Sequence, residues 1–442
     1  MRQKTVFLFW LPLFASWLLM TAEGPIISAT INRLPNEVIM LAAQGIVISL
    51  SVTIESPIIN LLATSTALVK DHASYLTVRR YTIQWMVLLT VITIIIAFTP
   101  VFDLIIINLL GTPAQVAQWV KPGMQIMTFW SAAIAWRRFL QGVLIHFGYP
   151  QKMAWGTAVR LLASGGVAIG FGIWTELPGV IIGTSSLMAG VIAEAIYATI
   201  ATRPLMKNEL SPTNSTIEEP PLTFQELNSF HLPLAGTSVM ILLVQPLVTF
   251  SLARLDNPTQ SLAAWPVLFQ ILLVMRAAAF ALPEAVIALT KGGDTYRPIR
   301  HFAAYVAIGV SAAMFLFAFT PLADFYIFVI QDMTELVGAL TSSVLALYIL
   351  FPGMTVIAMW LRGLLIHSRA TTNVNVAMGI NLLVTAVILT IGLHQQWAGL
   401  PTAAAALNIA IFCEIIYLAW RTQRFIPIGL PFGKQWQATP SV

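Results

Sequence analysis

The sequence has little charge and almost no cysteine. Charged residues make up 9% of its 442 residues and hydrophobic residues make up 58%, whereas a soluble domain carries about 25% charge. The composition therefore predicts an integral membrane protein. Cys413 is the single cysteine, which excludes an intrachain disulfide and a cysteine-based zinc or iron–sulfur site.

Sequence motifs for ATP hydrolysis and for hydrolytic catalysis are also missing. The chain has no GxxxxGK[ST] loop, no HExxH and no serine-nucleophile elbow. We therefore expect no enzyme, no metal site and no cofactor, and we expect any energy to come from an ion gradient or from the substrate's own gradient. The net charge of +5 does not require a nucleic acid partner, because membrane proteins collect Lys and Arg on the cytoplasmic side.

The chain contains two copies of one pattern, related by an offset of 221 residues. Residues 9–13 (FWLPL) recur as 230–234 (FHLPL), and residues 142–146 (GVLIH) recur as 363–367 (GLLIH). Pro25 falls on Pro246 at the same offset. Chance matches of Leu on Leu mean little in an apolar chain, but matched Pro and His residues predict an internal duplication.

The polar stretch at residues 204–226 separates the copies and is typical of a solvated linker. We predict an N-terminal six-helix lobe at 1–203, a cytoplasmic linker at 204–226, a C-terminal six-helix lobe at 227–424 and a cytoplasmic tail at 425–442. Since a span needs about 20 apolar residues, the predicted spans are about 6–31, 36–68, 80–101, 117–147, 153–175, 177–202, 229–252, 258–289, 301–322, 337–368, 374–393 and 399–420.

The distribution of basic residues predicts the orientation. With a cytoplasmic N-terminus, 15 of the 23 Lys and Arg residues fall inside, and only Arg33, Lys121 and Arg254 fall outside. The predicted fold class is an all-α integral membrane protein with about 12 transmembrane helices in two parallel six-helix lobes, related by pseudo-twofold symmetry along the membrane normal. This plan favours a transporter with its substrate path between the lobes.

Glu23 is the first candidate for function, because ionisable residues inside a bilayer are costly. It stands next to Gly24 and Pro25 in the first predicted span, where proline removes a backbone hydrogen bond and weakens the helix. We predict that Glu23 and Pro25 form an ion-coupling site for H⁺ or Na⁺. A structural hydrogen bond or ion pair of Glu23 is the alternative.

Glu55 and Arg276 occupy the same repeat position and carry opposite charge. We predict an interlobe gate in which this pair closes the inner side of the path. The alternative is that each residue pairs within its own lobe. Glu284 follows Pro283 on the same predicted span as Arg276, and we place it as a candidate on the substrate path.

Arg160, Glu194 and Glu414 are the remaining substrate-path candidates. Arg160 can meet an anionic substrate or pair with Glu194 in its own lobe. Glu194 and Glu414 lie in matching segments, AEAIY and CEIIY, and their duplication favours a structural role in each lobe. For Arg137, Arg138 and Arg362, near span ends, we expect side chains that snorkel to the interface.

Two segments resemble a known superfamily. Residues 137–142 (RRFLQG) with 148–150 (GYP) resemble the pattern RxxLQxxGxxxxP of multidrug and toxic-compound extrusion (MATE) transporters and polysaccharide flippases, the MOP superfamily. Glu23 with residues 31–33 (INR), and Arg137 followed by Arg160, are similar to motifs of the progressive ankylosis family. The resemblance implies alternating access, cation coupling at Glu23, and export of small anions such as pyrophosphate, nucleotide or citrate. The short linker and the short C-terminal tail depart from animal members of that family.

The sequence therefore predicts an ion-coupled secondary transporter that exports small organic solutes. A cation-coupled multidrug exporter and a flippase for a lipid-linked precursor are the alternatives within transport, and a non-transporting membrane scaffold is the alternative outside it. We expect a small-molecule substrate, the lipid bilayer as surroundings, and a monomer. The expected location is a prokaryotic inner membrane with both termini in the cytoplasm.

Overall fold

The computed structural model describes residues 3–149, 151–210, 222–290, 293–368 and 370–424, and every regular element in them is helical. The first half forms α1 (Gln3–Thr21), α2 (Glu23–Ile31), α3 (Glu37–Glu55), α4 (Leu61–Leu68), α5 (His72–Phe98), α6 (Val101–Asp103), α7 (Ala114–Ile126), α8 (Trp130–His146), α9 (Gln151–Trp174) and α10 (Gly179–Asn208). The second half forms α11 (Phe224–Leu242), α12 (Val244–Leu252), α13 (Pro258–Phe280), α14 (Leu282–Leu289), α15 (Gly293–Phe319), α16 (Pro321–Asp324), α17 (Glu335–Leu345), α18 (Phe351–His367), α19 (Thr371–His394) and α20 (Gly399–Thr422).

Shorter helical turns join several of these helices. They are the 3₁₀ turns η1 (Ser56–Ile58), η3 (Met127–Phe129) and η6 (Ala346–Tyr348), and the π-helical turns η2 (Leu104–Leu109) and η5 (Phe325–Ile330). The two π-helical turns follow Pro100 and Pro321, which are themselves related by the 221-residue offset.

Ten helical segments among the described residues are long and apolar enough to cross a membrane. An eleventh is the pair Glu335–Tyr348 and Phe351–His367, which is bent by 49°. The remaining predicted span, about 117–147, corresponds to α7 and α8, which have 13 and 17 residues. These two helices meet at η3, and α8 carries two arginines, so this stretch does not read as one long apolar helix.

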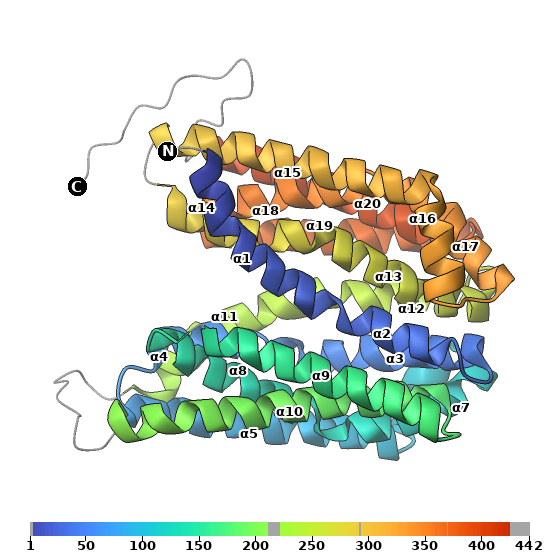
Figure 1. The fold of residues 1–442 in the computed structure, drawn as a ribbon, viewed down its shortest axis with the longest axis horizontal. Coiled ribbons are helices and arrows are strands. Elements are labelled where there is room, and N and C mark those ends of the chain that lie inside the picture. The colour runs from blue at the N-terminus through green and yellow to red at the C-terminus, as the bar shows by residue number, and fades with distance from the viewer. Residues whose placement is uncertain (1–2, 150, 211–221, 291–292, 369, 425–442) are drawn as a thin grey trace. The chain divides into compact units, whose positions relative to one another are not determined.

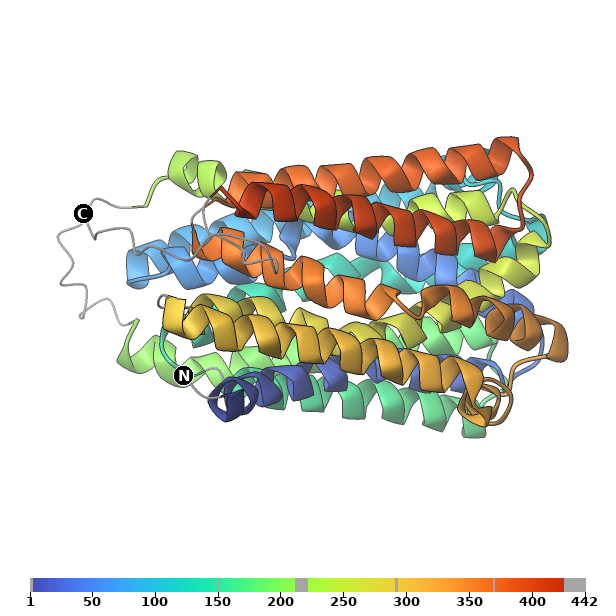
Figure 2. The ribbon, with the colours of Figure 1, turned by 90° about the horizontal axis from the view of Figure 1, so that it is seen from above.

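Backbone contacts divide the chain into two compact units. Unit 1 comprises Met1–Pro25, Leu255–Asn257 and Ala264–Val442, and unit 2 comprises Ile26–Arg254 and Pro258–Ala263. In unit 1, α1 packs against α14 and α15 (Figure 1), and α19 lies beside α20 (Figure 2). In unit 2, α11 packs against η1 and α4, α12 packs against α3, and α9 lies beside α10.

The units group residues by contact, whereas the predicted lobes at 1–203 and 227–424 follow the repeat, and the first helix of each half packs on helices of the other half. The predicted lobes and linker stay predictions. Helix α10 continues to Asn208, where Leu205 is buried and its carbonyl accepts the Glu209 N–H. Helix α11 begins after a capping box of Thr223 and Glu226. Residues 211–221 of the linker and the whole predicted tail, 425–442, lie outside the described residues.

The internal duplication is present in the backbone. Asn36 and Asn257 precede α3 and α13 with φ of 59° and 51°, and Gly111 and Asp332 follow the π-helical turns with φ of 68° and 52°. Each pair is related by the 221-residue offset, and left-handed φ is uncommon outside glycine and asparagine. Unusual turns at matched positions show that the two halves share one backbone plan.

Candidate functional site

The first helix of each half is interrupted at the same repeat position. Helix α1 ends at Thr21, four residues before Pro25, and α11 ends at Leu242, four residues before Pro246. Because proline has no N–H, it cannot bond to the carbonyl four residues earlier. The first helix is thus broken close to Pro25, where the sequence predicted a weakened helix, and the break recurs in the second half.

Glu23 is the first residue after this interruption and is only 8% exposed. Polar side chains of unit 1 contact the two residues that follow it. The Gln331 side chain donates to the Pro25 carbonyl at 3.2 Å and lies 3.0 Å from the Tyr326 hydroxyl. The Gln270 side chain packs so closely on Gly24 that a Cβ there would lie 2.9 Å from it. The second half keeps the interruption without the acid, since Val244 stands at the equivalent position.

Glu194 is the centre of a buried charge cluster in unit 2. The Arg137 guanidinium donates to Glu194 Oε2 at 2.6 Å, and the Gln141 amide donates to Oε1 at 3.0 Å. Arg160 Nη1 lies 3.8 Å from the same carboxylate, as the in-lobe alternative for Arg160 predicted. Glu194 is fully buried, so these contacts supply the charge compensation that a buried carboxylate needs.

Glu414 is the centre of an equivalent cluster in unit 1. Arg362 Nε donates to Glu414 Oε1 at 2.7 Å, and Arg362 Nη2 forms an ion pair with the same oxygen. The Asn381 amide donates to Oε2 at 2.8 Å. Arg362 stands at the repeat position of Gln141, so relative to Arg137 the arginine has moved by four residues, about one helical turn.

Arg137 and Arg362 therefore do not snorkel, and that prediction was wrong for both. Each pairs with a fully buried acid on α10 or α20. Their positions along α8 and α18 suggested the membrane–water interface. The guanidiniums instead pair with buried carboxylates that are 57 and 52 residues away in the sequence. The signal that could have revealed them is the duplicated acid, combined with an arginine on one face of the fourth span in both halves.

Glu55 ends α3 and belongs to the same neighbourhood as Glu194. It is 7% exposed, and its charge interacts with the guanidiniums of Arg137, Arg138 and Arg160. Its Oε2 has no hydrogen-bond partner among the described residues, and neither has Arg138 Nε. The cluster in unit 2, defined here as these five residues including Glu194, thus holds three guanidiniums and two carboxylates.

Arg276 lies on α13 in unit 1, where its charge interacts with Arg362 and Glu414. The cluster in unit 1, defined by these three residues, holds two guanidiniums and one carboxylate. Glu55 and Arg276 thus each have charged neighbours within their own unit, and the predicted gate between them stays a prediction. Glu284 is exposed on α14, and no ion pair joins it to Arg276 in the described part of the chain.

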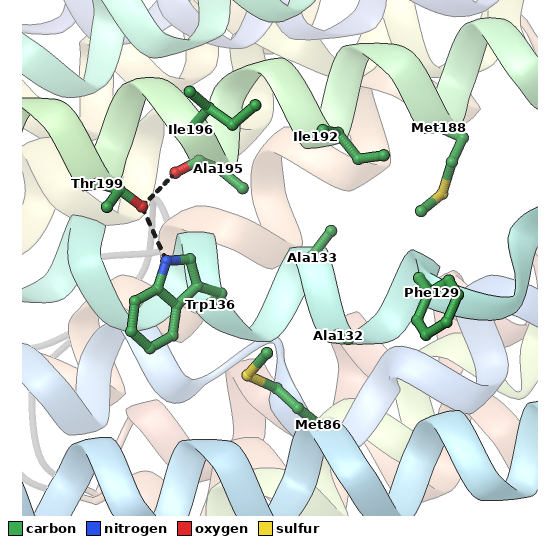
Figure 3. Close-up of a pocket in the computed structure, with 10 residues that line it drawn as sticks. All are labelled: Met86, Phe129, Ala132, Ala133, Trp136, Met188, Ile192, Ala195, Ile196 and Thr199. Atoms are coloured by element: carbon green, nitrogen blue, oxygen red, sulfur yellow. Dashed lines mark hydrogen bonds between the residues drawn. The ribbon is translucent and has the colours of Figure 1, made fainter.

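Two apolar grooves lie at equivalent repeat positions on the outside of the units. The groove of unit 2 has a volume of about 390 Å³, between α5, α8 and α10 (Figure 3). Its polar groups are satisfied locally, because Trp136 Nε1 donates to Thr199 Oγ1 and Thr199 donates to the Ala195 carbonyl. The groove of unit 1, about 510 Å³, is lined by Leu350, Met354 and their neighbours. Such walls suit lipid chains rather than a charged solute.

No acid, histidine or cysteine cluster suited to a metal ion is found within the described residues. No protein-family model matches the chain, and no curated protein matches it in sequence. Solved structures do match its fold over nearly the whole length.

A multidrug resistance MATE transporter of the MOP superfamily, in its inward-facing conformation, has a TM-score of 0.72 at 11% identity, covering 96% of this chain and 99% of that one. The lipid II flippase MurJ, in an inward closed conformation, has a TM-score of 0.71 at 15% identity, covering 94% and 87%. A MOP superfamily transporter from Pyrococcus furiosus, described by a reverse polarity of its binding pocket, has a TM-score of 0.66 at 12% identity, covering 96% of each chain.

At these identities the likeness concerns the fold. The fold class predicted from the sequence is confirmed, and the chain is an integral membrane protein with the fold of MATE transporters and of the flippase MurJ.

Proposed function

We propose that this chain is a secondary active transporter that exports small organic anions, such as pyrophosphate, nucleotide or citrate, by alternating access. The observation that carries the proposal is the excess of guanidinium over carboxylate in the buried charge cluster of unit 1, where two arginines meet one acid. Burying uncompensated charge is costly. A carboxylate or phosphate of the substrate compensates such an excess, and a cationic drug increases it.

The MATE fold supports transport as the class of function, since the solved proteins that share it are transporters or flippases by name. A link to the progressive ankylosis family agrees with anion export. We place the protein in a prokaryotic inner membrane as a monomer. The predicted excess of Lys and Arg on one side supports the placement of both termini in the cytoplasm.

Glu23 is the proposed site of coupling to H⁺ or Na⁺. It is a buried carboxyl in a membrane-spanning segment, which is a functional position by default. It also begins α2 directly after the helix interruption. Binding of a cation there changes the charge at the weakest point of the first span, where the backbone lacks a hydrogen bond.

Export of a lipid-linked precursor is a second candidate. The likeness to the lipid II flippase, with a TM-score of 0.71, is as strong as that to the MATE transporter. A precursor carried on a lipid phosphate is an anion as well, so the charge clusters alone do not separate it from a small soluble anion. An assay with soluble anions separates the two, because a flippase for a lipid-linked precursor would move none of them.

The test is transport in proteoliposomes with an imposed pH or Na⁺ gradient. Pyrophosphate, ATP, citrate and a cationic dye are offered to the wild type, to Glu23→Gln and to the control Glu176→Gln. Glu176 is an exposed acid between α9 and α10, so its replacement removes one negative charge far from the buried clusters. We expect gradient-driven movement of an anion that is lost in Glu23→Gln and kept in the control.

Movement of the dye in place of anions would assign the protein to multidrug export. Anion transport that is unchanged in Glu23→Gln would make this acid structural and leave the coupling site elsewhere. Absence of any transport would favour the flippase, or a scaffold that transports nothing.

A further inference from the structure

The Arg276 guanidinium lacks a polar partner in the described part of the chain. It forms no ion pair there, and its buried Nε has no hydrogen-bond partner. Two aromatic rings lie close to it, since its Cζ lies 5.2 Å from the ring centre of Phe280 and 4.8 Å from that of Phe351. Cation–π contacts stabilise a guanidinium, but they leave its N–H donors without acceptors.

The one carboxylate that acts on Arg276 is already occupied. Glu414 Oε1 accepts from Arg362, and Oε2 accepts from Asn381 at 2.8 Å. Arg362 in turn uses Nε and Nη2 for Glu414, while its Nη1 faces the Met359 thioether at 3.8 Å. A thioether is a weak acceptor, so this second arginine also has donor capacity to spare.

Phe280 and Phe351 offer Arg276 ring faces but no hydrogen-bond acceptor. The N–H groups along the edge of the planar guanidinium therefore remain for a ligand. Carboxylate and phosphate groups match this edge with two parallel hydrogen bonds. The two guanidiniums carry one charge more than Glu414 neutralises, so an oxyanion completes the cluster.

We propose that Arg276 and Arg362 form an oxyanion-binding site within unit 1, which takes a carboxylate or phosphate group of the ligand. The inference rests on the proposed function, because it assigns the anion of an anion exporter to named donors. It belongs to the second half alone, since Glu55 stands at the repeat position of Arg276 and would repel an oxyanion there. The source of the oxyanion is either a free small solute or a lipid headgroup.

The test measures binding to purified protein in nanodiscs of zwitterionic lipid, by isothermal titration calorimetry with pyrophosphate and with citrate. We expect Kd to rise at least tenfold in Arg276→Gln and by a smaller factor in Arg276→Lys, which keeps the charge without the planar edge. The control is Arg424→Gln, because Arg424 is exposed and stacks on Trp420 at 4.6 Å. Its Kd should equal that of the wild type.

An unchanged Kd in both Arg276 variants would overturn the site, and so would a wild type that binds neither a soluble anion nor phosphatidic acid placed in the nanodisc. Binding of phosphatidic acid alone, weakened by Arg276→Gln, would support the site and identify a lipid headgroup as the source. Arg276→Lys keeps the test decisive if the Gln variant does not elute as a single monodisperse species.

The site and the proposed function fail in different experiments. Anion transport by wild type and Arg276→Gln with equal KM would leave the transporter standing and remove the site. Anion binding that depends on Arg276, without gradient-driven movement of any anion, would leave the site standing and remove the exporter.

Discussion

Moving the arginine of unit 2 by one helical turn tests the ion pairs most sharply. Glu194 pairs with Arg137 in unit 2, whereas Glu414 pairs with Arg362 in unit 1, and Arg362 stands at the repeat position of Gln141. Residues four apart lie on the same face of a helix. The double variant Arg137→Ala, Gln141→Arg should therefore pair with Glu194 as Arg362 pairs with Glu414.

The structure sets the size of the effect. Arg137→Ala alone leaves Glu194 fully buried, and its carboxylate keeps its contacts with Gln141 at 3.0 Å and with Arg160 at 3.8 Å. Removing one partner of a buried ion pair costs about 3–5 kcal/mol. We expect about 3 kcal/mol for this variant, because the remaining partners compensate part of the charge. The double variant should return to within about 1 kcal/mol of the wild type, the cost of typical imperfect packing at a substituted site.

The assay is chemical unfolding in detergent, followed by helical circular dichroism, for the wild type, the single variant and the double variant. The control is Arg424→Ala, which removes an exposed arginine at the end of α20. A single variant as stable as the wild type would show that Arg137 does not neutralise Glu194. A double variant no more stable than the single variant would refute the interpretation that the two arginine positions are interchangeable around this acid.

Two further predictions concern helix packing and the π-helical turn η2 of unit 2. Gly142→Ala should lower the unfolding midpoint in the same assay, because a Cβ there would lie 2.4 Å from the Leu62 carbonyl oxygen. The matched control Gly166→Ala has open space around it and should raise the free energy of unfolding by about 0.5–1 kcal/mol. Equal effects of the two substitutions would contradict the prediction of a steric clash at Gly142. Arg254→Gln should speed amide hydrogen exchange at the end of η2, because Arg254 donates to the carbonyl of Leu110. Hydrogen exchange is measured by mass spectrometry. An unchanged exchange rate would show that other contacts stabilise the turn.

Hydropathy and the positions of the prolines predicted the membrane-spanning helices. Nearly every predicted span coincides with a long apolar helix, and the interruption at Pro25 falls where a missing N–H requires it. The sequence did not predict that α1 and α11 pack on helices of the opposite half. Apolar helix faces carry little information about their partner, since side chains of similar shape pack against one another in many arrangements.

The sequence predicted which residues belong to the candidate site, but it did not predict which of them contact one another. Glu194 and Glu414 were assigned to structural roles because they are duplicated, and both lie in buried ion pairs. Their partners Arg137 and Arg362 were assigned to the interface, since depth along a helix does not say which face meets an acid on another helix. The contact depends on sequence separations of 57 and 52 residues, which no local pattern encodes.

The divergence of the two halves separates a constraint on folding from one on function. A fully buried acid requires a cation nearby, and both halves satisfy this requirement although the arginine has moved from one helical turn to the next. What is kept is therefore the pair and not the position of its arginine. The same requirement does not explain Arg276, which stands at the repeat position of Glu55, carries the opposite charge and forms no ion pair within the described residues. The proposed oxyanion site would explain why this buried guanidinium stands where the other half has an acid. That is the reason to begin mutagenesis with this position.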